Sequence, residues 1–220
     1  METVELIRLA CYVVDIIVCF ILVGYFIREY VYKKLRASLA WAVGFLLFGF
    51  LIISLASYTT VAEVSKFQVM MAFIFAALAV SSLYYGASLV YFGEHSFFRE
   101  KMTITLFVAV LVIGSLLTLV TQEDKLVSTM GFWTTWIFFS VYIAIGTMFY
   151  SVASKLSKGD PRKRPIIMVA LAWYIVSIWN NYVGLAWGEN PAVEAGIFLL
   201  GSFGYVLLLY GMTTGKTTKK

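Results

Sequence analysis

Asp15 is the one residue, among the 29 that carry a formal charge, that must lie deep inside an apolar segment. A charge at the centre of a membrane span costs roughly 2.5–3.5 kcal/mol on insertion scales, so such a residue is expected to face the protein interior and to have a partner. Arg8, Cys11, Asp15 and Cys19 share one helix face, because they are spaced three, four and four residues apart. Arg8 is two turns away from Asp15, ~10 Å along the axis, so direct pairing would need a bent side chain or a water. Two roles are open for Asp15: a proton-linked switch or ligand contact in a polar cavity, or a hydrogen-bonded acid that ties helices together.

A second group of polar side chains falls in the apolar segment 165–187. Asparagine inside lipid hydrogen-bonds across helices for ~0.6–2 kcal/mol, so these residues could be structural or could contact a ligand. They lie toward the outer half of the segment, close to the start of the next one, which would suit an outward-facing pocket. Tryptophan and tyrosine are also ordinary anchors at a membrane interface. The candidates are Ser177, Trp179, Asn180 and Asn181, together with Glu194 at the start of the segment 192–212; Trp173, Tyr174, Tyr182 and Trp187 lie nearby.

The sequence contains few residues that could form a catalytic site. His95 is the sole histidine of the sequence, and it lies in a connection between apolar segments. Metal-assisted hydrolysis needs a cluster of His, carboxylate or Cys ligands, and Ser-His-Asp chemistry needs a histidine beside its nucleophile. We therefore expect no catalytic site, no metal and no cofactor.

The elements that must position these residues follow from composition. Of the 220 residues, 61% are hydrophobic and 13% are charged, against about 25% charged in soluble domains. A helix needs ~20 mainly apolar residues to cross a bilayer. We predict an all-α membrane protein, with one transmembrane domain over 1–213, a short basic tail over 214–220, and a first span that is retained rather than cleaved as a signal. The seven predicted spans are 6–27, 38–58, 67–92, 103–121, 130–153, 165–187 and 192–212.

The distribution of cations predicts the orientation. Cationic loops are retained on the cytoplasmic side of a membrane. Fourteen of the 17 Lys and Arg residues fall in the tail or in the connections after the first, third and fifth spans. We expect the N-terminus outside and the C-terminus inside. Topology and anionic lipid account for the net charge of +5, so no nucleic-acid partner is expected. The fourteen are Arg28, Lys33, Lys34, Arg36, Arg99, Lys101, Lys155, Lys158, Arg162, Lys163, Arg164, Lys216, Lys219 and Lys220.

The three prolines, Pro161, Pro165 and Pro191, all lie at or outside the ends of the predicted spans. Pro165 and Pro191 fit the first turn of a helix, and Asn190 is a candidate N-cap before Pro191. Carriers that bind substrate at broken helices usually show those breaks in sequence. Uninterrupted spans therefore lower the expectation of a carrier without removing it.

Short sequence matches suggest an internal repeat. Leu39-Ala40-Trp41 opens the second span and Leu171-Ala172-Trp173 opens the sixth, while Tyr84-Tyr85-Gly86 and Leu209-Tyr210-Gly211 lie near the ends of the third and seventh. Both pairs fit a 3+1+3 arrangement, in which the first three and last three spans are parallel copies related about the membrane normal.

Seven spans with an outside N-terminus resemble the microbial rhodopsins, and the likeness extends to Phe203-Gly204, Phe132-Trp133 and Trp136. Those rhodopsins bind retinal through a lysine of the seventh span. Aligning on Phe203-Gly204 puts Leu200 at the position of that lysine, and the seventh span has no lysine. We expect no Schiff-base retinal, although a rhodopsin-like bundle stays compatible with the sequence.

A further set of short motifs is spread over nearly the whole chain: Lys33-Lys34-Leu35-Arg36, Ser38 to Phe45, Tyr85-Gly86, Phe98-Arg99-Glu100-Lys101 and Trp173 to Tyr182. In these motifs the sequence resembles the seven-transmembrane sensor region of prokaryotic histidine kinases and related signalling proteins. Members of that family usually continue into a cytoplasmic output domain, whereas this sequence ends at Lys220, so the resemblance implies a separate cytoplasmic or membrane signalling partner. It also implies a prokaryotic cell membrane.

Three functions are compatible with these patterns. The first is a non-catalytic sensor or receptor-like module that detects a small apolar or amphipathic ligand, or the state of the bilayer. The second is a small-molecule or ion carrier with a polar path past Asp15. The third is a structural subunit of a membrane complex, held by small-residue faces such as Gly201 with Gly204 or Ser82 with Gly86.

Overall fold

The computed structural model describes residues 3–58, 65–185 and 190–214, which form seven long helices and no strand. Each helix contains a stretch long and apolar enough to cross a membrane. The prediction of an all-helical membrane protein with seven spans is confirmed at this level. The helices are α1 (Thr3–Lys33), α2 (Arg36–Tyr58), α3 (Lys66–Tyr91), α4 (Glu100–Val120), α5 (Glu123–Ser154), α6 (Lys163–Leu185) and α7 (Pro191–Thr214).

Two helices extend well beyond the apolar segments from which they were predicted. α1 continues to Lys33, where Glu29 and Lys33 form an ion pair of 2.7 Å at i,i+4 spacing. α5 begins at Glu123, although its strongly apolar part starts only at Gly131. Helical hydrogen bonding continues into polar sequence outside the apolar part, so hydropathy marks the part of a helix suited to the bilayer rather than its ends. Of the other boundaries, residues 186–187 and 215–220 lie outside the described residues.

The helix starts predicted from proline are confirmed. Pro191 is the first residue of α7, and the Asn190 side chain accepts hydrogen bonds from the backbone N–H groups of Ala192 (3.1 Å) and Val193 (3.3 Å). Pro165 lies in the first turn of α6, where the missing N–H breaks no helical bond. Asn190 thus caps two of the backbone donors at the start of α7, and Pro165 presents none in the first turn of α6.

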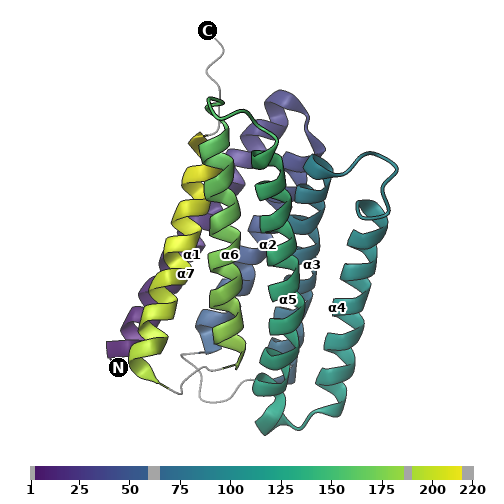
Figure 1. Cartoon of the computed structure of the whole chain (residues 1–220). Helices are drawn as coiled ribbons and strands as arrows, with labels where there is room; N and C mark the ends of the chain where they lie inside the picture. Colours follow the sequence, from purple (N-terminus) through teal and green to yellow (C-terminus); the bar gives the residue numbers. More distant parts are fainter. Residues whose placement is uncertain (1–2, 59–64, 186–189, 215–220) are drawn as a thin grey trace.

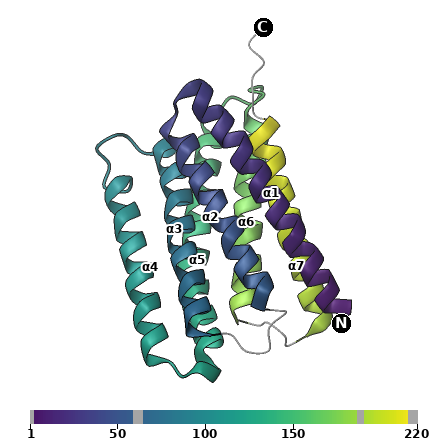
Figure 2. The ribbon, with the colours of Figure 1, turned by 180° about the vertical axis from the view of Figure 1, so that it is seen from behind.

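The helices form two layers of three, with α4 at one edge (Figure 1). α5, α6 and α7 make the front layer of that view, and α1, α2 and α3 make the layer behind it, which Figure 2 shows from the other side. Within a layer, sequential helices are neighbours. Between layers, α1 lies beside α7 and α3 lies beside α5, while α4 contacts only α3 and α5 among the described helices.

The middle of the bundle has a different construction from its two sides. In the described parts of the chain, no Cα atom of α2 comes within 8 Å of a Cα atom of α6, although these are the central helices of the two layers. Large aromatic side chains bridge this separation, as in the stacked rings of Phe45 and Trp173, whose centroids are 6.3 Å apart. The bundle centre is thus built from side chains rather than from close backbone contact.

Helices within a layer approach closely because small residues face large ones. The Trp41 indole occupies the space in which a Cβ on Gly86 would lie, and the Trp179 indole does the same at Gly201. Such small-residue contacts are the usual basis of helix association in lipid, where there is no hydrophobic driving force between helices. Apolar side chains such as Ile17 and Leu116 are instead exposed on the outer surface, as contact with lipid requires.

The connection between α5 and α6 holds a local charge pair. The Asp160 carboxylate accepts hydrogen bonds from the Arg162 backbone N–H (2.8 Å) and from the Arg162 guanidinium (2.7 Å). These bonds favour the ionised acid and lower the pKa of Asp160 to about 2. Asp160 therefore stays ionised over the whole physiological range and helps to hold the turn.

Candidate functional site

Asp15 lies in α1 with its side chain wholly buried, and Cys11 and Cys19 lie buried on the same face. The face predicted from the spacing is therefore turned into the protein. Neither carboxylate oxygen of Asp15 has a hydrogen-bond partner among the described residues. Ser202 of α7 lies close enough to interact with the carboxyl, but without hydrogen-bond geometry, so Asp15 lacks the full set of partners that its cost in a membrane demands.

Arg8, the cation expected nearest to Asp15, is paired with another acid. Its guanidinium donates to Glu194 Oε1 of α7 from Nε, at 2.8 Å, and also from Nη2. Side-chain exposure is 14% for Arg8 and 3% for Glu194, so the pair is largely shielded from solvent. Glu194 thus satisfies the charge of Arg8 two turns away from Asp15.

The α7 side of Asp15 carries two hydroxyl groups. Ser202 lies close enough to interact with both the Cys11 thiol and the Asp15 carboxyl, and its hydroxyl donates a long bond of 3.4 Å to the Cys11 carbonyl. Tyr205, one turn further along α7, is buried and lies within electrostatic range of Asp15. Its phenolic oxygen has no hydrogen-bond partner in the part of the chain that the structure describes.

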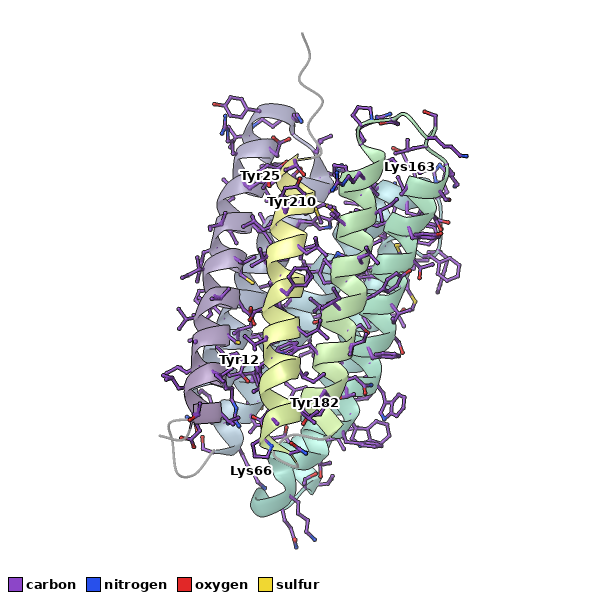
Figure 3. All side chains as sticks on the ribbon, turned by 60° about the vertical axis from the view of Figure 1, so that its left-hand side comes forward. Tyr12, Tyr25, Lys66, Lys163, Tyr182 and Tyr210 are labelled. Carbon is purple, nitrogen blue, oxygen red and sulfur yellow. The ribbon has the colours of Figure 1, made fainter. Side chains whose placement is uncertain are left out.

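Tyr12 and Trp179 are two further buried aromatic residues of this region, and Trp179 belongs to α6. Tyr12 lies on α1 between the ribbons of α1 and α7 (Figure 3), and its ring meets Phe198 edge-on at 5.4 Å. Trp179 of α6 meets Phe198 and Tyr205 edge-on, each at 6.1 Å. The Tyr12 hydroxyl and the Trp179 indole N–H are buried and make no hydrogen bond within the described ranges.

The aromatic contacts extend across the bundle to α2 and α5. Phe48 of α2 contacts Tyr205 at 5.9 Å and Tyr142 at 6.3 Å, and Tyr142 in turn stacks on Trp173 at 5.5 Å. The Tyr142 hydroxyl and the Trp173 indole N–H are also buried without a hydrogen-bond partner in the described structure. We call these connected rings the central aromatic cluster; its members are Tyr12, Phe48, Tyr142, Trp173, Trp179, Phe198 and Tyr205.

Unpaired polar atoms in such a position are costly. Each buried donor or acceptor left without a partner costs about 1–3 kcal/mol. In folded proteins such groups are usually satisfied by buried water or by a ligand. The carboxyl of Asp15 and the polar atoms of the central aromatic cluster therefore have the chemistry of a binding site.

The polar residues predicted on span six divide between two faces of α6. Ser177 is buried and donates a 3.2 Å hydrogen bond to the Phe139 carbonyl of α5, so it joins two helices. Asn180 is half-buried three residues further on, with a side-chain nitrogen that lacks a hydrogen-bond partner among the described residues, and Asn181 is half-buried beside it. Trp179 instead faces α7. The structure thus places Trp179 and Arg8, the partner of Glu194, against Phe198, and directs Ser177 toward α5.

Several members of the site were not predicted from the sequence. Tyr12, Tyr142 and Tyr205 were missed, although a tyrosine well inside an apolar span is itself a signal, because its hydroxyl needs a partner there. The Arg8–Glu194 pair could have been inferred from two opposite charges near the starts of two parallel spans. Phe132, Trp133, Trp136 and Phe203, which carried the rhodopsin likeness, have exposed side chains and do not join the cluster.

Within the described ranges, no three His, Cys, Asp or Glu side chains gather as a metal-binding group. No family model matches this chain, and no characterised protein or solved structure is significantly similar to it. The likeness to the histidine-kinase sensor region therefore rests on the sequence patterns alone, and function must be argued from the central aromatic cluster.

Proposed function

We propose that this chain is a receptor-like membrane module that binds a small, partly polar molecule at the central aromatic cluster and signals through a separate partner. The observation that carries the proposal is the set of buried polar atoms without partners between the two helix layers. Asp15, Tyr12, Trp179 and Tyr205 all belong to it, and they come from three helices that ligand binding would draw together. A bound molecule that supplies the missing hydrogen bonds would thereby bias the packing of one layer against the other.

The wide middle of the bundle supports the same function. Side chains rather than backbone fill the space between α2 and α6, so rotamer changes of a few rings would make room for a ligand, around which the helices then close. The proposed orientation has the starts of α1 and α7 outside, which would put the Arg8–Glu194 pair on the outer side of the cluster. The basic connections would then face the cytoplasm, where a signalling partner or anionic lipid would meet them.

A carrier is the second candidate, because one specific observation favours it. Exchanging α1, α2 and α3 for α5, α6 and α7 turns each neighbouring pair of helices into another neighbouring pair: α1–α2 becomes α5–α6, α2–α3 becomes α6–α7, and α1–α7 becomes α5–α3. With α4 at the edge, this supports the 3+1+3 arrangement of parallel repeats. In such carriers the substrate site lies between the two repeats near the membrane midplane. The central aromatic cluster likewise joins the two sets of helices, through contacts such as those of Phe48 with Tyr142 and Tyr205.

Ligand binding is tested by thermal unfolding of the protein in lipid nanodiscs, followed by intrinsic tryptophan fluorescence over a library of small amphipathic compounds. We expect compounds that raise the melting temperature of the wild type but not of Trp179→Leu or Tyr205→Phe. Trp133→Leu is the matched control, because this exposed tryptophan of α5 lies outside the cluster. A library without stabilising compounds, or stabilisation that survives both cluster variants, would overturn the proposal.

Liposome uptake of a stabilising compound separates the two candidates. A receptor-like module would bind it without passing it across the bilayer, whereas a carrier would show uptake that Asp15→Asn abolishes. Orientation is tested with single cysteines at Glu94 and Gln122, both exposed, after Cys11 and Cys19 are replaced by alanine. An impermeant maleimide should label Gln122→Cys on intact cells and Glu94→Cys only after permeabilisation; the reverse pattern would contradict the proposed orientation.

A further inference from the structure

We infer that the molecule bound at the central aromatic cluster is a small organic cation, with the Asp15 carboxylate as its counter-ion. The inference deepens the proposed function and rests on it. It follows from the charge that the site lacks, from the rings that surround Asp15, and from the failure of other cations to fit.

An ionised Asp15 would leave this region with one negative charge in excess. Arg8 pairs with Glu194, and the other groups that interact with Asp15 are neutral hydroxyls and thiols. A buried carboxyl stays ionised only when a cation or several donors accompany it, and otherwise it binds a proton. A ligand that carries one positive charge would supply what this part of the described chain lacks. The neutral neighbours are Cys11, Tyr12, Cys19, Ser202 and Tyr205.

The rings beside Asp15 also favour a cation. The faces of Trp, Tyr and Phe carry negative potential, so several rings around an acid attract an ammonium group, and most strongly when it is desolvated. Tyr12 and Tyr205 lie within electrostatic range of the acid, and Trp179 contacts Tyr205. The cluster already accepts one cation, since the Arg8 guanidinium lies 5.9 Å from the centre of the Phe198 ring. The same ring contacts Tyr12 and Trp179.

A metal ion fits these residues poorly. Divalent ions need several carboxylate, imidazole or thiolate ligands. Within the described chain, Asp15 does not belong to any group of three such residues that could hold a metal ion. An organic ammonium needs one counter-ion and apolar or aromatic walls. Its N–H or polarised C–H groups can meet the Asp15 oxygens, while a hydroxyl on the same molecule can meet the unpaired phenol and indole groups.

The test measures thermal unfolding of the full chain in nanodiscs with four probe cations: methylammonium, tetramethylammonium, choline and phenethylammonium. Choline is compared with 3,3-dimethyl-1-butanol, which has nearly the same shape and no charge. We expect at least one of the four cations to raise the melting temperature in a saturable way, and the uncharged alcohol to leave it unchanged. Asp15→Asn, which keeps the size of the side chain, should weaken cation binding at least about thirtyfold, the effect of removing one buried charge of a pair.

Two further variants make the test specific. Trp179→Leu should weaken binding about three- to tenfold through the loss of ring attraction. Asp160→Asn is the control, because this acid lies in a connection and is not part of the cluster. Because Asp15→Asn removes a buried acid without a hydrogen-bond partner, it should fold at least as well as the wild type, and its own melting curve checks this.

The outcomes separate this inference from the proposed function. If neutral amphipathic compounds stabilise the protein through Trp179 and Tyr205 while all four cations fail, the cation inference is overturned and the binding function stands. If choline and 3,3-dimethyl-1-butanol bind equally well, or Asp15→Asn binds the cations like the wild type, the carboxylate is not the counter-ion and the inference is wrong. If neither class of compound binds, both proposals fall.

Discussion

Asp15→Leu should make the ligand-free protein more stable, although Asp15 is the most conspicuous polar residue of the interior. The side chain is wholly buried, and its two oxygens have no hydrogen-bond partner among the described residues. Removing an unsatisfied buried polar group recovers about 1–3 kcal/mol, and an apolar side chain suits the span. Leucine is larger than aspartate, and overpacking at a buried site costs part of that gain. We therefore expect the free energy of unfolding to rise by about 1 kcal/mol.

The assay is equilibrium unfolding in mixed micelles, with SDS as the denaturant and tryptophan fluorescence as the signal from the six tryptophans. Ser177→Ala is the matched control, because this buried hydroxyl does make a hydrogen bond, to the Phe139 carbonyl at 3.2 Å. Its loss should lower the free energy of unfolding by about 0.5–1.5 kcal/mol. The two variants, each of which removes a buried polar group, should thus change the free energy of unfolding in opposite directions.

A saturating ligand should make the wild type more stable than Asp15→Leu, the reverse of their order without ligand. Binding to the native state adds RT ln(1 + [L]/Kd), which is about 2.7 kcal/mol at a hundredfold excess over Kd, and Asp15→Leu would not receive it. A fall of 1 kcal/mol or more in the ligand-free Asp15→Leu protein would refute the reasoning, since it would mean that the carboxyl already stabilises the fold through a partner.

Three further predictions concern other contacts. Glu194→Gln should lower the free energy of unfolding by about 3–5 kcal/mol, because it removes the acid that pairs with the shielded Arg8 guanidinium. The double variant Arg8→Met with Glu194→Met should recover most of that loss in the same SDS titration. A double variant as unstable as Glu194→Gln would show that the pair is not the source of the effect. Gly86→Ala should lower the free energy of unfolding by about 1–3 kcal/mol, because the added Cβ would overlap the Trp41 indole. Gly24→Ala, which has no atom near its added Cβ, should leave the free energy of unfolding unchanged or raise it. Equal effects at the two glycines would contradict the packing argument. Finally, the sequence has three aspartates, so carboxyl-labelled aspartate should give three NMR signals, of which one, assigned by Asp160→Asn, titrates near pH 2. Arg162→Gln should raise that pKa part of the way toward about 3.9, because the backbone N–H of residue 162 still donates to the carboxylate. Because the folded-state pKa is the lower one, any stability from this bond is present above about pH 4 and is lost as the pH falls through about 2; an unchanged titration in Arg162→Gln would remove the Arg162 side chain as a cause.

The fold class followed from sequence because lipid permits so few structures. A segment in the bilayer must satisfy its backbone hydrogen bonds internally, so a long apolar run predicts a helix whatever its neighbours are. Proline and asparagine marked the start of α7 for an equally local reason, since the first turn of a helix leaves its N–H groups free for a cap. The ends of α1 and α5 were predicted less well, because polar helical turns outside the apolar stretch carry no hydropathy signal.

The interior position of Asp15 was also determined by the sequence, because the cost of a charge in lipid turns its face toward protein. Helical spacing also predicted that Cys11 and Cys19 lie on the same helix face as Asp15. The sequence could not identify what lies opposite that face. Arg8 was the nearest cation along the chain, yet it pairs with Glu194, which is 186 residues away.

Only the tertiary structure decided which residues make the site. Helical periodicity fixes the face of a residue on its own helix, but the depth at which two helices meet depends on how their side chains interlock. At Gly201 the lack of a side chain admits the Trp179 indole, and this contact sets Trp179 against Phe198 and Tyr205, beside Asp15. Ser177, two residues earlier on α6, meets α5 instead. One helix therefore contributes to the site and to the scaffold from two faces of the same turn, a division made by packing between helices that no single segment encodes.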